Sequence, residues 1–520
     1  MTTLDMNDAK HLTGGRLMLA AVAVALATFL LVLDYSIANV SIPYISGTLA
    51  VSVDEGVYVI TSFAVGNAIV LPLCGWLTRR VGLIRLMTFS ILGFTALSWV
   101  CGISDSLAML VMARFLQGAV AGPMIPLSQT LIILIFPPEK QKSALSVWST
   151  VVIVAPIVGP ILGGWLSYDY SWPWIFFINI PFGLFSALTI QALLKPYDTV
   201  PEKLPVDWIG LALLAISVAC LQFLLDKGEQ YDWFNSPLIR KCGVISLIGF
   251  SFLIPWELFR HKPLLELRLL KIRSFALSVL AISVAYAIYF GAVVLIPLWL
   301  QTQMGYTAAW AGVAVASLGI LPVLFSSLMG RLTAKVGALI PLAISFILFA
   351  GSSFDTARMN TDIDIGHIAF SRFLLGGGLL FLIVPLFQLQ MQDLPADKLP
   401  AGAGLFHFAR AMMGGAGTSI FTTMWTRRSA FHHANLVAEL TDRPPFAPFM
   451  EHLSLLGVEG PSRWTLLNQI VDGQAAVLGI NDCFFFMGWC FLALIPFLLL
   501  GRKSSSSPAA SPGHLHGTME

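Results

Sequence analysis

Two arginines stand inside long apolar segments of this sequence, where a charged side chain is costly. Arg114 lies in LAMLVMARFLQGAVAGPMIPL, and Arg372 lies 258 residues later in AFSRFLLGGGLLFLIVPL. A charge within hydrocarbon costs roughly 2.5–3.5 kcal/mol on insertion scales, so such residues usually have a partner or a functional role. The repetition predicts a duplicated membrane unit with a polar centre.

Asp34, in ATFLLVLDYSIANVSIP, is the one carboxylate that we place inside a membrane segment of the first half. Burial favours the neutral form of a carboxylic acid, and a nearby guanidinium favours the carboxylate. With Arg114 as its neighbour, Asp34 would be able to exchange a proton near neutral pH and couple proton uptake to helix movement. The alternative is an acid near an outer helix end that merely faces water.

Each of the other charged or titratable candidates has two alternative interpretations, one functional and one structural. Arg114 is too basic to lose its own proton, so it either tunes Asp34 or fixes helix packing through backbone carbonyls. Arg372 lies closer to an outer helix end, where snorkelling or packing is an equal alternative. His407 and Arg410, in LFHFARAMMGGAG, are candidates for binding protons or substrate. A histidine titrates near neutral pH, but a lone one is also common as a hydrogen-bonded core residue.

Uncharged polar residues also interrupt the apolar segments. They either line a cavity or join helices by hydrogen bonds worth about 0.6 kcal/mol each. These cavity candidates are Asn39, Asn67, Gln129, Gln388 and Gln390.

The stretch APIVGPILGGW (155–165) combines small residues and prolines. Ala155, Gly159 and Gly163 share one helix face, where small residues let two helices touch. Prolines within a helix bend it. We therefore predict a bent helix that seals one face of a pore, although plain close packing explains the pattern too. The predicted bend comprises Pro156, Gly159, Pro160, Gly163 and Gly164.

The composition indicates that the segments carrying these residues are membrane helices. The chain is 57% hydrophobic and 11% charged, against about 25% charged residues in soluble proteins. Stretches of about 18 apolar residues span a bilayer as helices, and only the one near 338–353 is marginal. They predict an all-α membrane protein with fourteen spans, near 17–41, 57–77, 84–102, 107–130, 144–166, 174–194, 208–225, 242–259, 275–300, 309–329, 338–353, 367–391, 402–424 and 481–500.

Basic residues indicate the orientation of these spans. Alternating the loops puts most lysines and arginines on one side, and the opposite short loops hold only Lys227, Arg240, Lys241 and Arg358. By the positive-inside rule both termini are cytoplasmic, which requires an even number of spans. Twelve spans remain the alternative if 208–225 and 242–259 form an interfacial hairpin, but both segments are long and nearly uncharged.

A second repeated motif supports duplication. GWLTRRVG (75–82) matches GRLTAKVG (330–337) at an offset of 255 residues, close to the offset of the two arginines. Two six-helix repeats with a site between them are a transporter architecture. The expected parts are a cytoplasmic N-terminus (1–16), a first bundle (17–194), two inserted helices with their linkers (195–274), a second bundle (275–501) and a disordered cytoplasmic tail (502–520).

Two loops stand out in this organisation. Gly75, Arg79, Arg80 and Gly82 belong to a basic cytoplasmic loop, which is either a gate with a tight turn or simply a product of the positive-inside rule. Residues 425–480 form a long external segment, and long loops are usually functional or disordered. Helix-like spacing within it favours ordered helices that extend into the outer compartment.

Several function classes are excluded. The six cysteines form no CxxC pair, no Walker A sequence occurs, and no cluster of His and Asp ligands or nucleophile with a base is found. We therefore expect no metal, no cofactor, no nucleic-acid partner and no enzymatic activity. Energy for pumping must come from an ion gradient or a separate subunit.

Motifs along nearly the whole chain resemble one family. LDYSIANVSIP (33–43), GWLTRRVG, RFLQGAVAG (114–122) and GPILGG (159–164) resemble the helix-1, helix 2–3, helix-4 and helix-5 motifs of the fourteen-helix drug:proton antiporters of the major facilitator superfamily. WPWIFFINIPFG (172–183) is similar to the family's WRWIFxINxPxG. LDKGEQYDWF (225–234), GYTAAWAG (305–312) and the segment beginning WTRRSAFHH resemble the branch of EmrB-type inner-membrane pumps of Gram-negative bacteria.

This resemblance implies export of amphipathic or lipophilic compounds in exchange for protons, with Asp34 as proton carrier and Arg114 as its partner. It also implies a periplasmic membrane-fusion adaptor that docks partly through 425–480, and an outer-membrane channel beyond. Three departures are visible. Pro173 replaces the usual Arg, Arg79 replaces the Asp on which the family builds a gate salt bridge, and His407 stands where the branch often has Asn.

Two other functions remain open at this point. A dedicated exporter of one metabolite, such as a siderophore or fatty acid, fits the same residues. A transport-inactive receptor or scaffold would use the same fold and the long external segment, but the intact Asp34 and Arg114 argue against it.

Overall fold

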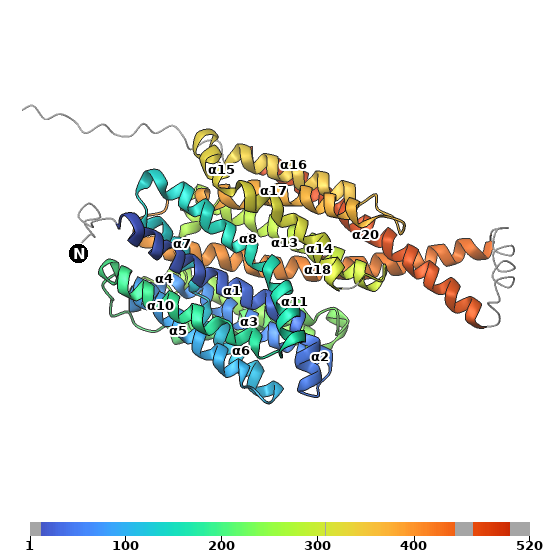
Figure 1. Cartoon of the computed structure of the whole chain (residues 1–520), viewed down its shortest axis with the longest axis horizontal. Coiled ribbons are helices and arrows are strands. Elements are labelled where there is room, and N and C mark those ends of the chain that lie inside the picture. The colour runs from blue at the N-terminus through green and yellow to red at the C-terminus, as the bar shows by residue number, and fades with distance from the viewer. Residues whose placement is uncertain (1–11, 307, 443–460, 500–520) are drawn as a thin grey trace, which may run out of the picture.

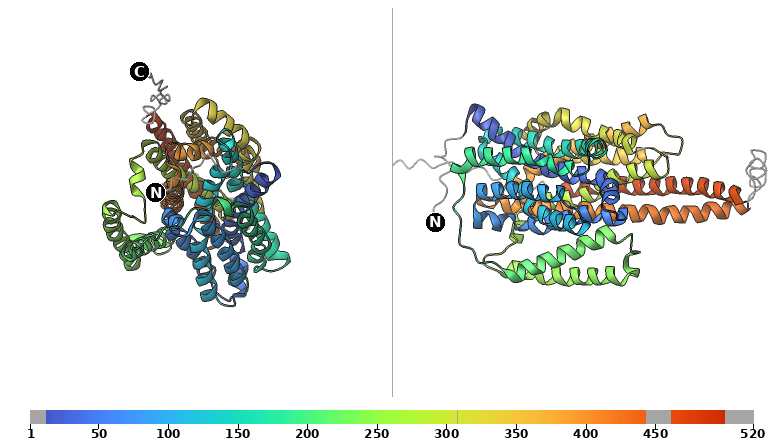
Figure 2. Two further views of the ribbon diagram at one scale, coloured as in Figure 1. Left: turned by 90° about the vertical axis from the view of Figure 1, so that its left-hand side faces the viewer. Right: turned by 60° about the horizontal axis from the view of Figure 1, so that its bottom comes forward.

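The computed structural model describes residues 12–306, 308–442 and 461–499, and the described residues form helices and their connections without any strand. Most helices run along the long axis of one elongated bundle (Figure 1). The N-terminus lies at one end, which we call the N-terminal end. Two helices, α18 and α20, project from the opposite end, which we call the extended end (Figures 1 and 2).

The first half of the bundle comes from the residues before the inserted helices. Its elements are α1 (Gly14–Thr48), α2 (Val53–Gly56), α3 (Tyr58–Val70), η1 (Leu71–Leu73), α4 (Cys74–Val81), α5 (Leu83–Gly102), α6 (Leu107–Ala121), α7 (Met124–Ile135), α8 (Pro138–Asp169), α9 (Trp174–Phe177), α10 (Asn179–Leu194) and η2 (Lys195–Tyr197).

The inserted hairpin and the second half follow. The hairpin consists of α11 (Trp208–Lys227), η3 (Trp233–Asn235) and α12 (Pro237–Phe259), and η4 (Leu267–Lys271) lies in the linker after it. The second half consists of α13 (Arg273–Thr302), α14 (Ala308–Ala316), η5 (Ser317–Gly319), α15 (Ile320–Val336), α16 (Leu339–Thr356), α17 (Ile365–Met391), η6 (Ala396–Lys398), α18 (Leu399–Asp442) and α20 (Pro461–Leu499).

Among the described residues, eleven helices are long and apolar enough to span a membrane, and twelve if α8 counts as one bent span. The all-α membrane class is therefore confirmed. Two of the fourteen predicted spans do not qualify. The segment 309–329 is divided among α14, η5 and α15, and 402–424 lies in α18, where Gly, Ser, Thr, His407 and Arg410 lower the hydropathy. Both inserted helices qualify as spans, which favours crossing over an interfacial position.

The interior is apolar across both halves, and the outer surface is apolar as well. One continuous core cluster includes residues of α1, α13 and α17. Large apolar side chains are exposed on the outside of the bundle, for example Leu247 and Phe252 of α12. A bilayer solvates such a surface where water would not, so the chain is a multi-pass membrane protein.

The structure corrects the prediction of a loop at 75–82. Residues Cys74–Val81 form α4, and the turn is confined to Gly82, whose φ of 103° suits glycine. Gly75 is helical, and its lack of a side chain serves packing: a Cβ there would lie 2.3 Å from the Cβ of Ala401 in α18. The motif therefore joins two halves of the bundle rather than making a tight loop.

The segment 425–480, predicted to be external, is helical wherever it is described. It continues α18 up to Asp442 and resumes with α20 from Pro461. Figure 2 shows these two helices side by side beyond the rest of the bundle. Ordered extended helices were predicted here, and the described parts agree. Residues 443–460, the first eleven residues and the predicted tail 502–520 lie outside the described residues.

Candidate functional site

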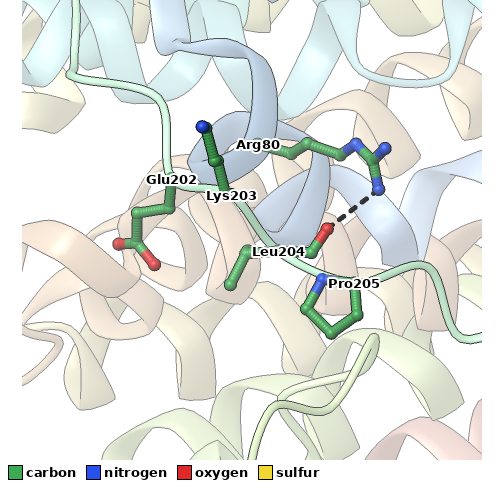
Figure 3. Close-up of a pocket in the computed structure, with 5 residues that line it drawn as sticks. All are labelled: Arg80, Glu202, Lys203, Leu204 and Pro205. Carbon is green, nitrogen blue, oxygen red and sulfur yellow. Dashed lines mark hydrogen bonds between the residues drawn. The ribbon is translucent and has the colours of Figure 1, made fainter.

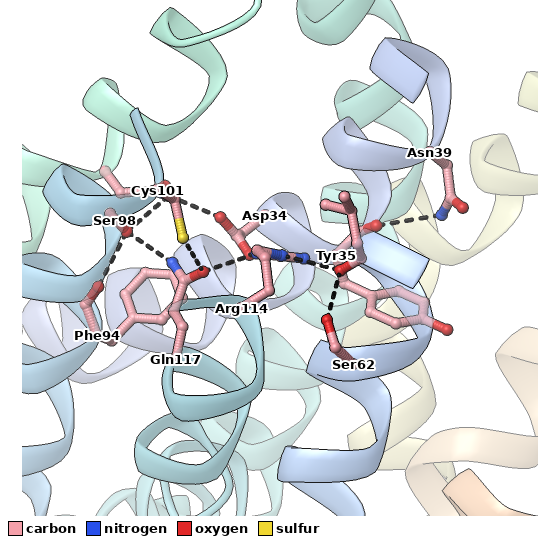
Figure 4. A network of polar contacts seen from close by, with 11 residues as sticks. Asp34, Tyr35, Asn39, Ser62, Phe94, Ser98, Cys101, Arg114 and Gln117 are labelled. Atoms are coloured by element: carbon pink, nitrogen blue, oxygen red, sulfur yellow. Dashed lines mark hydrogen bonds and ion pairs between the residues drawn. The ribbon is translucent and has the colours of Figure 1, made fainter. Parts of the chain in front are cut away.

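Asp34 of α1 and Arg114 of α6 meet in the interior of the first half. Both are fully buried, and Arg114 Nη1 lies 2.5 Å from Asp34 Oδ2. Figure 4 shows the arginine pointing at the carboxylate from the neighbouring helix. A buried ion pair survives desolvation only if its remaining polar atoms are also hydrogen-bonded.

Asn179, Gln117 and the Val59 carbonyl supply such bonds, whereas Arg114 Nη2 is buried without a hydrogen-bond partner in the described residues. Asn179 Nδ2 donates to the second carboxylate oxygen of Asp34 at 2.9 Å, and Arg114 Nη1 also donates to Gln117 Oε1 at 2.8 Å. Arg114 Nε donates to the carbonyl of Val59 at 3.2 Å. Ser98 Oγ accepts from Gln117 Nε2 at 2.8 Å (Figure 4). The residues of the network lie on five helices, α1, α3, α5, α6 and α10. A change in the charge of Asp34 therefore alters hydrogen bonds between all five.

Aromatic rings and a close backbone contact hold Arg114 in place. Its guanidinium lies over the ring of Phe63, 4.2 Å from the centroid, and 5.4 Å from the ring centroid of Phe176. A Cβ at Gly118 would lie 2.1 Å from the carbonyl oxygen of Phe63, so only glycine lets α6 approach α3 here. That approach brings Arg114 within reach of the Val59 carbonyl.

Helix α8 packs on α1 beside Asp34. Its two straight parts, Pro138–Pro156 and Ile161–Asp169, are bent by 42°. Cβ atoms at Gly159 and Gly163 would come within 2.5 Å of Ser36 Oγ and 2.8 Å of the Ile37 carbonyl. Ser36 Oγ also donates to the carbonyl of Pro156 at 3.0 Å. The bend therefore falls where the prolines were expected to place it, between Pro156 and the residue after Pro160, and it rests on the turn that follows Asp34.

Gly164 differs from the other predicted bend residues, because a Cβ there would meet no atom within 4 Å. Of the three predicted glycines, Gly159 and Gly163 are therefore the two that pack closely against α1.

Arg372 of α17 occupies the corresponding place in the second half but has different partners. It is 1% exposed, and its Nη1 donates to the carbonyl of Ala292 at 3.3 Å. Its Nη2 donates to Thr356 Oγ1 and to Ser371 Oγ. No carboxylate lies within 4 Å of it among the described residues. The charge of Arg372 is therefore stabilised by hydroxyl and carbonyl oxygens and not by an ion pair in the described residues.

His407 lies at the contact between the halves. It is 1% exposed, and its Nε2 lies 2.9 Å from Gln129 Oε1 of α7. Gln129 Nε2 donates to Gln390 Oε1 of α17 at 3.3 Å. His407 Nδ1 and Gln390 Nε2 are buried without a hydrogen-bond partner in the described part of the chain. Three of the predicted polar candidates therefore form one cluster across the interface.

The remaining candidates do not join this cluster. Arg410 Nη1 donates to the hydroxyl of Tyr286 at 3.4 Å. Asn39 is exposed and donates to the carbonyl of Tyr35 in its own helix, and Asn67 and Gln388 are half-buried. Whether these residues line a substrate cavity stays a prediction.

Sequence reasoning missed Asn179, Gln117 and Ser98 as members of the Asp34 network. Two of them belong to sequence motifs already described, Gln117 to RFLQG and Asn179 to WPWIFFINIPFG. Polar residues inside those apolar runs were the available signal. Ser98 carries no such signal, because serines are common in membrane helices.

Comparison with known proteins assigns the chain to a family. The sequence profile of the Major Facilitator Superfamily matches residues 24–418. The chain belongs to the Major Facilitator Superfamily. It is thus a membrane transporter and not an enzyme, and transporters of this superfamily need no cofactor. In the described ranges no three His, Cys, Asp or Glu side chains gather as a metal site would require.

Two relatives and one solved structure place the chain within the superfamily. It is 42% identical to the multidrug export protein EmrB of Escherichia coli K12 over 94% of this chain and 96% of that protein. It is 39% identical to the fatty acid resistance protein FarB of Neisseria gonorrhoeae over 95% and 98%. The human organic anion transporter MFSD10 shares the fold at a TM-score of 0.59 and 12% identity, covering 94% of this chain and all of that one. The resemblance to EmrB-type pumps is therefore confirmed.

Proposed function

We propose that this chain is a proton-driven antiporter that exports amphipathic or lipophilic compounds across the bacterial inner membrane. The observation that carries the proposal is the fully buried Asp34–Arg114 pair with Asn179 on the second carboxylate oxygen. A titratable acid that sits at the junction of several helices can link its protonation to helix movement. The EmrB relative, named a multidrug export protein, supports the substrate range.

The chemistry of the cycle follows from the hydrogen bonds of the pair. Ionised Asp34 accepts from Arg114 and Asn179, and these bonds hold α1 against α6 and α10. Protonation removes the charge that Arg114 neutralises, so the guanidinium needs other acceptors, of which Gln117 and the Val59 carbonyl are already bound. Helix α8, bent against α1 at Ser36 and Ile37, would follow the resulting shift of α1. The proton gradient thus supplies the energy.

The orientation and the assembly belong to the same proposal. We place the N- and C-termini in the cytoplasm, which puts the extended end with α18 and α20 in the periplasm. The projecting residues of 425–480 would then contact a periplasmic membrane-fusion adaptor, with an outer-membrane channel beyond it. The chain would be the pump subunit of a tripartite system.

A dedicated exporter of one compound is the second candidate. The FarB relative, named for fatty acid resistance, favours it. An export assay that compares long-chain fatty acids with several unrelated dyes would separate the two, because a dedicated exporter moves only one class.

The test is export of a fluorescent substrate by cells that contain the wild type or Asp34→Asn, with and without a protonophore. We expect the substitution and the protonophore each to reduce export at least tenfold. Asp105→Asn is the matched control, because this acid is exposed in the connection before α6. Comparable amounts of protein in the membrane must be shown. Normal export by Asp34→Asn would refute the role of Asp34, and export that resists the protonophore would refute proton coupling.

A further inference from the structure

The two halves are in backbone contact at the N-terminal end of the bundle. A Cβ at Gly75 of α4 would lie 2.3 Å from the Cβ of Ala401 in α18. A Cβ at Gly404 would lie 2.5 Å from the carbonyl oxygen of Leu71 and 3.0 Å from the Cβ of Cys74. Helix α4 belongs to the first half and α18 to the second. This seam, which we define by Gly75, Cys74, Ala401 and Gly404, is therefore closed.

Beside the seam, cations from both halves converge on one carboxylate oxygen. Glu266 Oε1 accepts a hydrogen bond from Lys398 Nζ at 2.7 Å and lies 3.4 Å from Arg79 Nη2. The Glu266 side chain is only 10% exposed. Arg79 stands in the last turn of α4, and Lys398 immediately precedes α18. The acid itself comes from neither bundle but from the linker between α12 and α13.

The two contacts of Glu266 are unequal. The contact with Lys398 has hydrogen-bond geometry, whereas Arg79 Nη2 is buried and has no hydrogen-bond partner in the described residues. Glu266 lies in the linker and is joined through η4 to α13 of the second half, and Lys398 directly precedes α18 of the same half. A movement that separates the halves at this end would therefore break the contact of Glu266 with Arg79 and keep the one with Lys398.

The linker before the hairpin is fastened to the first half instead. Arg80 Nη1 donates to the carbonyl of Leu204 at 3.0 Å, across a groove that residues 202–205 line (Figure 3). The amide of Glu202 donates to the carbonyl of Arg79 at 2.7 Å, and Asp198 pairs with Arg85 at 3.0 Å. Leu264 and Leu265 of the second linker also pack in one apolar cluster with Leu73 and Trp76 of the first half. The second linker therefore contacts both halves, and Glu266 is held to the second half by Lys398 and by the chain that continues into α13.

We propose that Glu266 is the acid of a charge gate that holds the two halves together at the N-terminal end, with Arg79 as its cation in the first half. The inference rests on the proposed transport function, since a gate has consequences only if the halves separate during the cycle. It also accounts for a departure from the family pattern. The motif position expected to carry an acid carries Arg79, and the inserted linker supplies the acid in its place.

The native Cys74 provides a direct test. It is fully buried at the seam, so its alkylation by a maleimide reports opening of that seam independently of export. The other five cysteines are replaced by serine, and labelling rates are measured in membranes. Glu266→Gln leaves two cations facing each other at the contact. We expect Cys74 in this variant to be labelled up to roughly fivefold faster than in the parent, since an ion pair of this kind contributes up to about 1 kcal/mol.

Two further variants complete the test. Arg85→Gln removes an ion pair at the same end that does not join the halves, so labelling should stay at the parent rate. Reversing all three charges (Arg79→Glu, Glu266→Lys and Lys398→Glu) should restore slow labelling, which also shows that the positions tolerate substitution. An unchanged rate in Glu266→Gln, or fast labelling in the triple reversal, would overturn the gate. A labelling change in a chain that exports nothing would support the gate and refute the transport function.

Discussion

The two halves of this transporter place an arginine at the same position and surround it differently. Arg114 donates to the Asp34 side chain, 80 residues earlier, and Arg372 donates to the backbone carbonyl of Ala292, also 80 residues earlier. Each arginine lies over a phenylalanine ring of its half, Phe176 or Phe484. The packing of the arginine is thus repeated, and the titratable acid is not.

The glycine one helical turn after each arginine, Gly118 or Gly376, shows how closely the packing is repeated. A Cβ at Gly118 would meet the carbonyl oxygen of Phe63 at 2.1 Å, and one at Gly376 would meet that of Leu318 at the same distance. Duplication therefore preserved the helix contacts that seat the arginine. In our proposal, proton transfer takes place in the first half. There the arginine donates to the carboxylate of Asp34, whereas Arg372 donates to the backbone carbonyl of Ala292.

Replacing each arginine by glutamine should give the largest difference in stability loss between the two halves. Arg114→Gln leaves Asp34 buried without its cation, and breaking a buried pair in this way costs about 3–5 kcal/mol. Arg372→Gln removes a charge that has no ion-pair partner within 4 Å in the described residues, so the cost should stay near the roughly 1–3 kcal/mol of unsatisfied polar groups. Thermal unfolding in detergent measures both. Equal losses would contradict the comparison.

Alanine at the two glycines should instead affect both halves alike. Gly118→Ala and Gly376→Ala each force a methyl group against a backbone carbonyl, and overpacking of this kind typically costs about 1–3 kcal/mol. Gly164→Ala is the control, since no atom lies within 4 Å of its Cβ position. Unfolding temperatures of the three variants check this. A loss confined to one half would mean that the repeat does not extend to packing.

Hydroxyl deletions should give a smaller and more specific difference. Ser98→Ala and Thr356→Val each remove one hydrogen-bonded hydroxyl next to the arginine network of their half, worth about 1 kcal/mol. Ser98 also supports Gln117 and Asn179 around Asp34. We therefore expect Ser98→Ala alone to shift the pH profile of export, measured as rate against external pH. A shift in Thr356→Val as well would place proton chemistry in both halves.

The smallest effect is expected at His407. The ring pairs with the amide of Gln129 between the halves, and an asparagine can keep a polar contact there. His407→Asn should leave proton-coupled export within about twofold of the wild type and alter substrate preference instead, because the side chain would position the interface and carry no proton. Loss of coupling, measured as substrate-induced proton release, would assign His407 a proton role.

The sequence by itself determined the membrane class, the duplication and the two arginines. Apolar runs of bilayer length and charges within them leave few alternatives, because an unsatisfied polar group in hydrocarbon is expensive. It also singled out Asp34 as the acid of the first half, since no other carboxylate falls within its apolar segments. The bend of α8 was readable as well, because prolines and small residues act locally on their own helix.

The tertiary structure decided which other side chains meet around the predicted Asp34–Arg114 pair and between the halves. Asn179 reaches Asp34 across 145 residues, and Gln129 reaches His407 across 278, distances over which no local pattern in the sequence carries information. The sequence predicts a loop at 75–82 because of its arginines, yet the helix Cys74–Val81 runs up to the turn at Gly82, and Gly75 packs against Ala401 of the other half. Glu266 has no distinguishing sequence context at all. Its significance comes from the folding that brings Arg79 and Lys398 to one carboxylate oxygen.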